Sequence, residues 1–231
     1  MTEQAVWPEV RAKVLRAAAS VGVATGAYGL SFGALGTAAG LSVVQTCALS
    51  VLLFSGGSQF ALVGVLGGGG NALSGSASAM LLGARNALYG ARLSPLLRLR
   101  GVRRLAGAQL VIDESTAVAL GSEDDGERAA RLGFWATGLA VFVLWNLATL
   151  VGALAGEAIA DPRVLGLDAA APAAFLALLA PRLRDRTAWL TAIVAAVVAV
   201  VVVPVVPVGV PVLIAALVPL AFILPRQGGD G

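Results

Sequence analysis

The stretch SVLLFSGGSQFALVGVL, Ser50 to Leu66, has the apolar character of a membrane helix. Five small or polar residues interrupt it in succession, namely Ser55, Gly56, Gly57, Ser58 and Gln59. Unpaired backbone groups are costly in a bilayer, so unwound backbone is tolerated there only where it lines a cavity or is buried in protein. We therefore expect an unwound, ligand-facing break at Ser55–Gln59. The alternative is a glycine contact between packed helices, with Gln59 hydrogen-bonded to a neighbour.

Such a break suits a small polar ligand. Free N–H groups at the start of a half-helix attract anions such as a carboxylate, and free carbonyl groups attract cations such as an ammonium group. A zwitterionic amino acid needs both, and discontinuous helices recur in the substrate sites of transporters. Ser31, in the motif YGLSFG of the preceding apolar run, is a further candidate for the same cavity.

The composition is that of a membrane protein. Of the 231 residues, 58% are hydrophobic and only 13% are charged, and the mean hydropathy is +0.88. A soluble domain usually carries about 25% charged residues. The net charge of +3 does not indicate nucleic-acid binding, because the arginines cluster in short connectors. The chain has no histidine and one cysteine, so we expect no metal, no cofactor and no intramolecular disulfide.

The apolar runs predict an all-α, polytopic integral membrane protein. We expect about six crossing helices plus one or two broken or re-entrant segments, since a span needs about 20 residues. The expected organisation is a cytoplasmic N-terminal segment 1–16, a single transmembrane domain 17–225 and a C-terminal tail 226–231. The apolar runs are 17–40, 43–66, 72–97, 105–120, 132–155, 169–180, 188–206 and 208–224.

The Lys and Arg distribution predicts the orientation. Basic residues precede the first span and form the connectors 98–104 and 182–186, which we place in the cytoplasm, with the acid-rich segment 157–168 outside. If the N-terminus and the connector 98–104 lie on one side, the chain between them crosses an even number of times. Three apolar runs lie there, so one does not cross, and the interrupted run 43–66 is the best candidate. The run 105–120 has basic flanks at both ends and is a second candidate for a re-entrant segment.

The first apolar run carries glycines at alternating spacings of four and three, which place them on one helical face. This pattern predicts a seam where another helix backbone approaches closely. The alternative is lipid-facing glycine. The residues are Gly22, Gly26, Gly29, Gly33, Gly36 and Gly40.

The run NALSGSASAMLLGARNALYGARLSP, Asn71 to Pro95, predicts a polar helix face. Ser74, Ser78, Arg85, Tyr89 and Arg92 share this face at 3.6 residues per turn. Arg85 lies near the middle of the run, where an arginine normally faces a polar cavity or a charged partner. It is therefore a candidate for substrate binding, and a purely structural ion pair is the alternative.

Asp113 and Glu114 lie in the short run AGAQLVIDESTAVAL. Adjacent helical residues diverge by about 100°, so we expect one of them to meet Arg85 and the other to face a water-filled path. Carboxylates at membrane depth are candidates for proton coupling. In the alternative interpretation, this short segment lies at the interface with both acids in water.

Several motifs together resemble the AzlC family, the large subunits of bacterial branched-chain amino acid exporters. The resemblance spans about Ala19 to Pro181 and implies export of valine, leucine and isoleucine, with methionine as a further candidate. It also implies a small hydrophobic partner subunit of the AzlD type. Where the family often has Arg-His before Tyr-Gly, this chain has Arg85-Asn86. The motifs are SFGALGTAAGLS, FSGGSQFA, LLGARNALYG, LVIDEST, LWNLATLVGALAG and GLDAAAPAAFLALLAP.

We therefore expect a secondary transporter in the bacterial inner membrane, and not an enzyme. No GxxxxGK[ST] motif is present, so an ion gradient, most simply of protons, would drive it. The expected substrate site comprises Ser31, Ser55–Gln59, Arg85, Asn86 and Tyr89, with Asp113 and Glu114 coupling protons. The alternatives are an integral membrane enzyme acting on lipid, for which EDDGE is the weak indication, and a non-catalytic membrane subunit.

Overall fold

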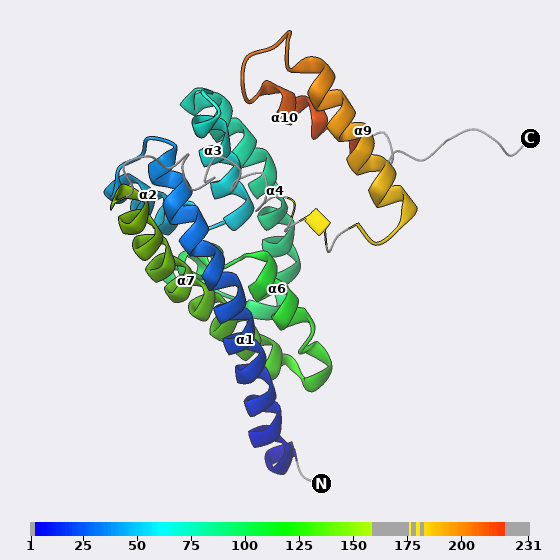
Figure 1. The fold of residues 1–231 in the computed structure, drawn as a ribbon. Coiled ribbons are helices and arrows are strands. Elements are labelled where there is room, and N and C mark those ends of the chain that lie inside the picture. Colours follow the sequence, from blue (N-terminus) through cyan, green and yellow to red (C-terminus); the bar gives the residue numbers. More distant parts are fainter. Residues whose placement is uncertain (1–2, 159–175, 177–178, 181–182, 220–231) are drawn as a thin grey trace, which may run out of the picture.

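The structure is a computed structural model that describes residues 3–158, 176, 179–180 and 183–219. The elements over these residues are helical, with no strand among them. Figure 1 shows two long helices side by side, with the last two helices of the described chain set apart from them. In chain order the elements are α1 (Glu3–Ala38), α2 (Val43–Leu52), α3 (Gly56–Gly67), α4 (Ala72–Leu97), α5 (Val102–Gln109), α6 (Asp113–Leu120), η1 (Glu123–Asp125), α7 (Glu127–Ala158), α9 (Arg186–Val202) and α10 (Val210–Ala215).

The glycine seam of α1 packs directly on α7, which confirms its predicted role. A Cβ at Gly29 would lie 2.5 Å from the carbonyl oxygen of Trp145, and one at Gly33 would lie 2.6 Å from the backbone nitrogen of Ala153. Only glycine allows two helix backbones to approach this closely. The glycines of α1 that meet α7 in this way are Gly22, Gly26, Gly29 and Gly33.

The last two glycines of the seam have other roles. A Cβ at Gly36 would lie 2.5 Å from the side chain of Thr46, so this position packs on α2 rather than α7. Gly40 lies beyond the end of α1 and has a φ of +90°. Glycine adopts this left-handed conformation without the steric cost of a Cβ, which lets the chain turn directly into α2.

The run 43–66 is a broken helical hairpin. Gln59 of α3 donates hydrogen bonds from Nε2 to the carbonyl oxygens of Leu49 (3.4 Å) and Ser50 (3.1 Å) in α2. In a continuous helix, residues ten apart would be separated by about 15 Å. A Cβ at Gly67, the last residue of α3, would lie 3.5 Å from the Cβ of Ala39, where α2 is about to begin. The chain therefore turns back, as expected of a segment that does not cross.

The break itself is shorter than expected and lies earlier in the chain. Only residues 53–55 are non-helical, and Gly56 to Gln59 form the first turn of α3. The expectation that all of Ser55–Gln59 is unwound is therefore wrong for the last four residues. Glycine disfavours a helix interior by about 1 kcal/mol relative to alanine, but this cost is not prohibitive where the neighbouring residues continue the helix.

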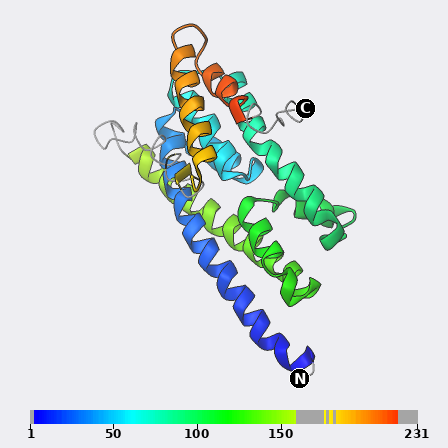
Figure 2. The ribbon, with the colours of Figure 1, turned by 90° about the vertical axis from the view of Figure 1, so that its right-hand side faces the viewer.

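The run 105–120 forms a second broken hairpin. Helix α5 ends at Gln109 and α6 begins at Asp113. Ser115 holds the break, because its hydroxyl donates to the Leu110 carbonyl at 2.6 Å and accepts from the Ile112 N–H at 3.1 Å. Just after α6, Glu123 pairs with Arg92 of α4, so this hairpin also returns to the end at which it started (Figure 2).

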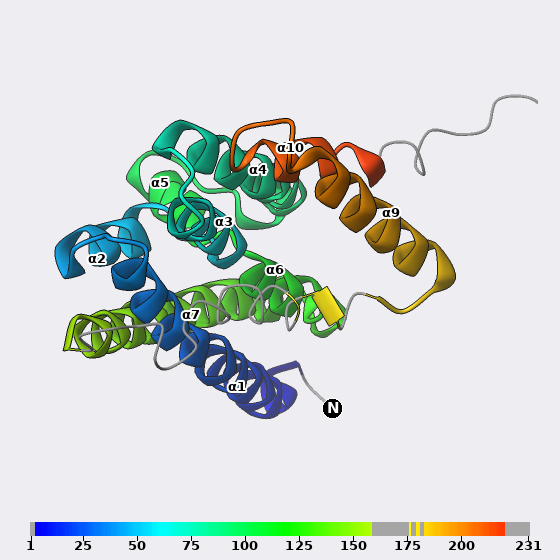
Figure 3. The same ribbon diagram turned by 45° about the horizontal axis from the view of Figure 1, so that its top comes forward.

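The tips of the two hairpins meet. Gln109, at the end of α5, donates from Nε2 to the carbonyl oxygen of Val51 in α2 at 2.7 Å. One hairpin begins after the C-terminal end of α1, and the other begins after the C-terminal end of α4. The ends of α1 and α4 at which they begin lie at opposite ends of the molecule (Figure 1), and Figure 3 shows α3 between α2 and α4.

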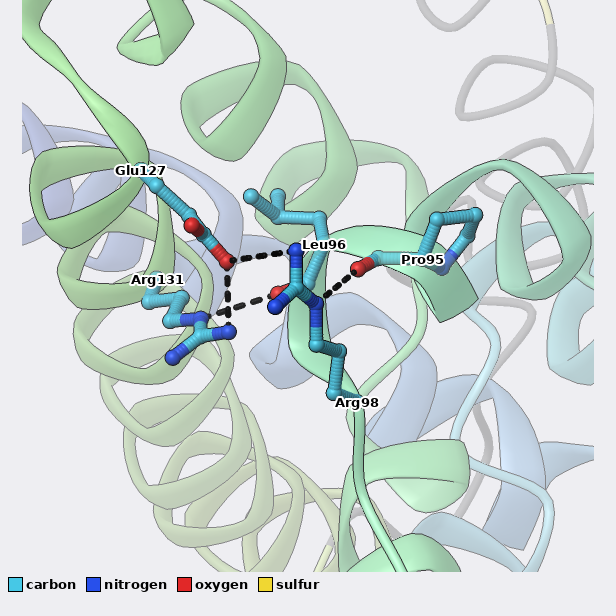
Figure 4. Close-up of polar contacts among 5 residues, drawn as sticks. All are labelled: Pro95, Leu96, Arg98, Glu127 and Arg131. Carbon is cyan, nitrogen blue, oxygen red and sulfur yellow. Dashed lines mark hydrogen bonds and ion pairs between the residues drawn. The ribbon is translucent and has the colours of Figure 1, made fainter.

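Ion pairs connect α4, α7, η1 and the N-terminal half of α1 at one end of the molecule. Figure 4 shows Arg98 and Arg131 converging on Glu127, with separations of 3.8 and 2.6 Å. The same arginines donate from Nε to the carbonyl oxygens of Pro95 (3.1 Å) and Leu96 (2.8 Å) at the end of α4.

At the same end, the ion pair between Lys13 of α1 and Asp125 of η1 connects these two helices, with an Nζ to Oδ2 distance of 2.7 Å. The N-terminal basic residues and the connector 98–104 therefore lie at the same end of the molecule, as the charge distribution predicted.

Among the described residues, two helical segments are long and apolar enough to cross a membrane by length and composition, namely Trp7–Ala38 and Glu127–Ala158. Helix α4 has 26 residues but carries Arg85 and Arg92. The expected number of about six crossing helices therefore stays a prediction. The expected outer loop 157–168 and the run 169–180 lie largely outside the described residues, as does the expected C-terminal tail.

Candidate functional site

A cavity of about 240 Å³ lies where the two hairpin breaks meet α1, α4 and α7. The first turns of both half-helices line it, through Gly56 and Gly57 of α3 and through Asp113 and Glu114 of α6. Its volume is slightly below the range of about 300–1,000 Å³ typical of drug-sized ligands. A small metabolite is therefore the kind of ligand that it could hold.

Arg85 lies between the two half-helices. Its Nη2 is 3.2 Å from Oδ2 of Asp113, which confirms the predicted partner. The same nitrogen would lie 3.2 Å from a Cβ at Gly57, so the absence of a side chain there lets the guanidinium group rest against the start of α3. The Nε of Arg85 is buried and has no hydrogen-bond partner among the described residues. The arginine therefore has unused hydrogen-bonding capacity in a cavity wall.

Both half-helices begin without a side-chain cap. Ser55, the N-cap residue of α3, makes no capping hydrogen bond, and its hydroxyl pairs instead with that of Ser58 at 3.1 Å. Ile112 precedes α6 and has no side-chain acceptor with which to cap it. The first N–H groups of a helix have no partner within the helix and carry the positive end of its dipole. The start of α3 therefore offers anion-binding N–H groups to the cavity, whereas the first turn of α6 carries the carboxylates of Asp113 and Glu114.

One wall of the cavity is aromatic. Trp145 of α7 is only 4% exposed, stacks on Phe32 and meets Phe60 edge to face. A Cβ at Gly56 would lie 3.2 Å from Cη2 of Trp145. The indole Nε1 is buried without a hydrogen-bond partner in the described part of the chain. This wall could receive an apolar group, with one hydrogen-bond donor nearby.

Most, but not all, of the predicted site residues meet at this cavity. Asn86 lines it, and the buried Oδ1 of this side chain has no hydrogen-bond partner within the described ranges. Ser58 and Gln59 are fully buried behind the lining, where they connect parts of the α2–α3 hairpin. Tyr89 packs against the hydrophobic core, and Ser31 lies on the exposed face of α1. The structure thus does not place Ser58, Gln59, Tyr89 or Ser31 in the lining.

Sequence reasoning missed the contributions of α1 and α7. Thr25 and Tyr28 of α1 line the cavity, as does Trp145 of α7. Their signal in the sequence is weak, because single aromatic or hydroxyl residues inside an apolar run are common in membrane helices. For Trp145, the adjacent Asn146 was the available hint, since an apolar run with a polar residue at its centre often faces protein rather than lipid.

Within the described residues, no three His, Cys, Asp or Glu side chains lie close enough together to hold a metal ion. The charged groups of the cavity are Arg85, Asp113 and Glu114. This arrangement can bind a small polar molecule through charge and hydrogen bonds.

Comparison with known proteins places the chain in a family. A search of curated proteins and a search of solved structures each gave no match. The family model described as AzlC protein matches residues 20–159, which is more than half of the chain and includes both hairpins. The chain therefore belongs to the AzlC family.

Proposed function

We propose that this chain is a secondary transporter that exports branched-chain amino acids across the bacterial inner membrane. The proposed substrates are valine, leucine and isoleucine, with methionine as a further candidate. The family supports a role in membrane transport. The observation that carries the proposal is the cavity between two broken hairpins of opposite direction, lined by both half-helix N-termini and by Arg85. Discontinuous helices that meet at mid-depth are a recurring way to build a transporter site.

The arrangement of the two hairpins also supports a conformational change that gives the two sides of the membrane alternating access to the site. Each is preceded by a long helix, α1 or α4, so the order of long helix followed by broken hairpin occurs twice in the first 120 residues. The two copies point in opposite directions. Inverted repeats of this kind allow one half to rock against the other, which exposes a central site alternately to each side.

The proposed driving force is a proton gradient. Asp113 and Glu114 are the acidic groups of the cavity and the candidates for carrying the coupled proton. A small hydrophobic subunit of the AzlD type is the proposed partner. The N-terminus and the ion-paired end of the molecule would face the cytoplasm, since basic residues concentrate there.

Efflux from preloaded cells tests this proposal. Cells loaded with labelled valine should lose it faster when they express the chain together with its partner subunit. Arg85→Ala should abolish this efflux at unchanged protein abundance. The matched control is Arg92→Ala on the same helix, whose partner Glu123 lies outside the cavity, and it should retain efflux. Wild-type efflux that no cavity variant reduces would indicate a non-catalytic subunit whose partner carries the substrate.

A further inference from the structure

We propose that the substrate binds by opening the Arg85–Asp113 ion pair and inserting between its two charges. The carboxylate of a zwitterionic amino acid pairs with Arg85, and its ammonium group pairs with Asp113. This inference rests on the transport function proposed above and deepens it, because it assigns the two charged ends of the substrate to two residues.

The ion pair has the geometry of a contact that can be replaced. It consists of one separation of 3.2 Å between Nη2 and Oδ2, and both side chains lie in the cavity wall, 31% and 23% exposed. A guanidinium group presents its donors as a planar fork that matches a carboxylate with two parallel hydrogen bonds. The Nε of Arg85 is buried without a partner in the described structure, so one donor of this fork is unused.

The start of α3 supplies the second part of the carboxylate site. The guanidinium group rests against Gly57, and the side chain of Ser55 does not cap the helix. A carboxylate on Arg85 would therefore lie next to the uncapped N–H groups of the first turn, where the helix dipole favours negative charge. Trp145 also lines the cavity, is 4% exposed, and has a buried indole Nε1 without a hydrogen-bond partner among the described residues.

The balance of charge within the Arg85–Asp113 pair favours a zwitterion over a simple anion or cation. An anion that bound Arg85 would displace Asp113 and separate its carboxylate from the guanidinium group. A cation that bound Asp113 would likewise separate the guanidinium group of Arg85 from the Asp113 carboxylate. Stranding one member of a partly buried pair is strongly unfavourable. A zwitterion replaces one ion pair by two and leaves the net charge of the cavity unchanged.

The apolar part of the substrate would pack on the apolar part of the lining. This part includes Trp145, Phe60, Phe54 and Val141. Gly56 keeps this space open, because a Cβ there would lie 3.2 Å from the indole ring. A short branched side chain would occupy it.

A ligand series tests the assignment of the two charges. The purified chain, reconstituted with its partner if it requires one, is titrated with L-valine, L-valinamide and L-2-hydroxyisovalerate, and binding is followed by thermal shift. Valinamide lacks the carboxylate charge, and the hydroxy acid lacks the ammonium group. Each should bind about tenfold to a hundredfold more weakly than valine, since each loses one charge-assisted interaction.

Variants then connect each charge to its residue. Arg85→Gln should remove the preference for valine over valinamide, and Asp113→Asn should remove the preference for valine over the hydroxy acid. The double variant Arg85→Gln with Asp113→Asn strands no charge, and it should bind all three ligands with similar, weak affinity. The matched controls are Arg92→Gln and Asp125→Asn, which break ion pairs outside the cavity and should keep the wild-type preferences.

The outcomes separate this inference from the proposed function. If valine binds and is exported but Asp113→Asn keeps the full preference over the hydroxy acid, the insertion mode is overturned while transport stands. Equal binding of all three ligands to the wild type would also overturn the insertion mode and leave transport standing. If no ligand shifts the wild type and no efflux occurs, the proposed function fails, and the insertion mode fails with it.

Discussion

Replacement of Gly33 by alanine tests the contact that holds the two long helices together. A Cβ at this position would collide with the carbonyl oxygen of Thr149. It would also lie 2.6 Å from the nitrogen of Ala153 and 2.9 Å from the carbonyl carbon of Gly152. All three are backbone atoms of α7, so none can move away by a side-chain rotation. The helices α1 and α7 must separate to accept the methyl group.

The expected loss of stability follows from two opposing terms. Overpacking against an unyielding wall costs about 3 kcal/mol, the upper end of the usual range. Alanine favours the helix over glycine by about 1 kcal/mol, which leaves a net loss of about 2 kcal/mol for Gly33→Ala. For a chain of 231 residues, each kcal/mol corresponds to a change in melting temperature of about 2–4 °C. We therefore expect a decrease of about 4–8 °C.

Gly90→Ala is the matched control, because Gly90 is also helical but no heavy atom lies within 4 Å of its Cβ position. It should gain about 1 kcal/mol from helix propensity alone and melt about 2–4 °C higher. The assay is thermal unfolding of both variants and the wild type in the same detergent, followed by circular dichroism. A Gly33→Ala variant that melts at or above the wild-type temperature would refute the close approach of α1 and α7.

Three further predictions concern the site, the topology and the ion pairs. Gly56→Ala combined with Gly57→Ala should abolish the thermal shift by valine, because each new methyl group lies 3.2 Å from a cavity side chain; a wild-type shift in the double variant would contradict this role. Single cysteines at Ser42 and Arg100, in a chain whose native cysteine is replaced, should react with impermeant reagents from opposite sides of the membrane, and labelling from one side would overturn the topology. Glu127→Gln should lower the free energy of unfolding by less than about 1 kcal/mol, because exposed ion pairs contribute little, and a decrease in melting temperature above about 4 °C would show a larger contribution.

The local features of the fold could be predicted from the sequence. The glycine spacing in α1 predicted its contact face, because residues three and four apart share one side of a helix. An interruption at Ser55–Gln59 was predicted from five small or polar residues in an apolar run, and the structure has it at residues 53–55. Its position was predicted less well, since Gly56 and Gly57 begin α3 rather than extend the break. Where helix and coil differ by about 1 kcal/mol per glycine, the neighbouring residues decide the boundary.

The sequence predicted that Arg85 pairs with Asp113 or Glu114, since an arginine at membrane depth needs a partner. Which of the two carboxylates faces Arg85 depends on the rotation of α6 about its own axis, and the sequence does not specify this rotation. Both carboxylates line the cavity, and the ion pair formed is that with Asp113.

The sequence by itself determined which apolar runs are helical, that two of them are candidates for an interruption, and that Arg85 requires a partner. These properties depend on residues close together in the chain. Only the tertiary structure decided that the two breaks meet, that Gln109 reaches Val51 across the hairpin tips, and that Trp145 forms a wall of the cavity. The physical reason is that each contact joins residues on separate elements, whose relative positions depend on the packing of the whole bundle. A helical period specifies which face a residue occupies, but the neighbour of that face is set by the assembly of the whole bundle.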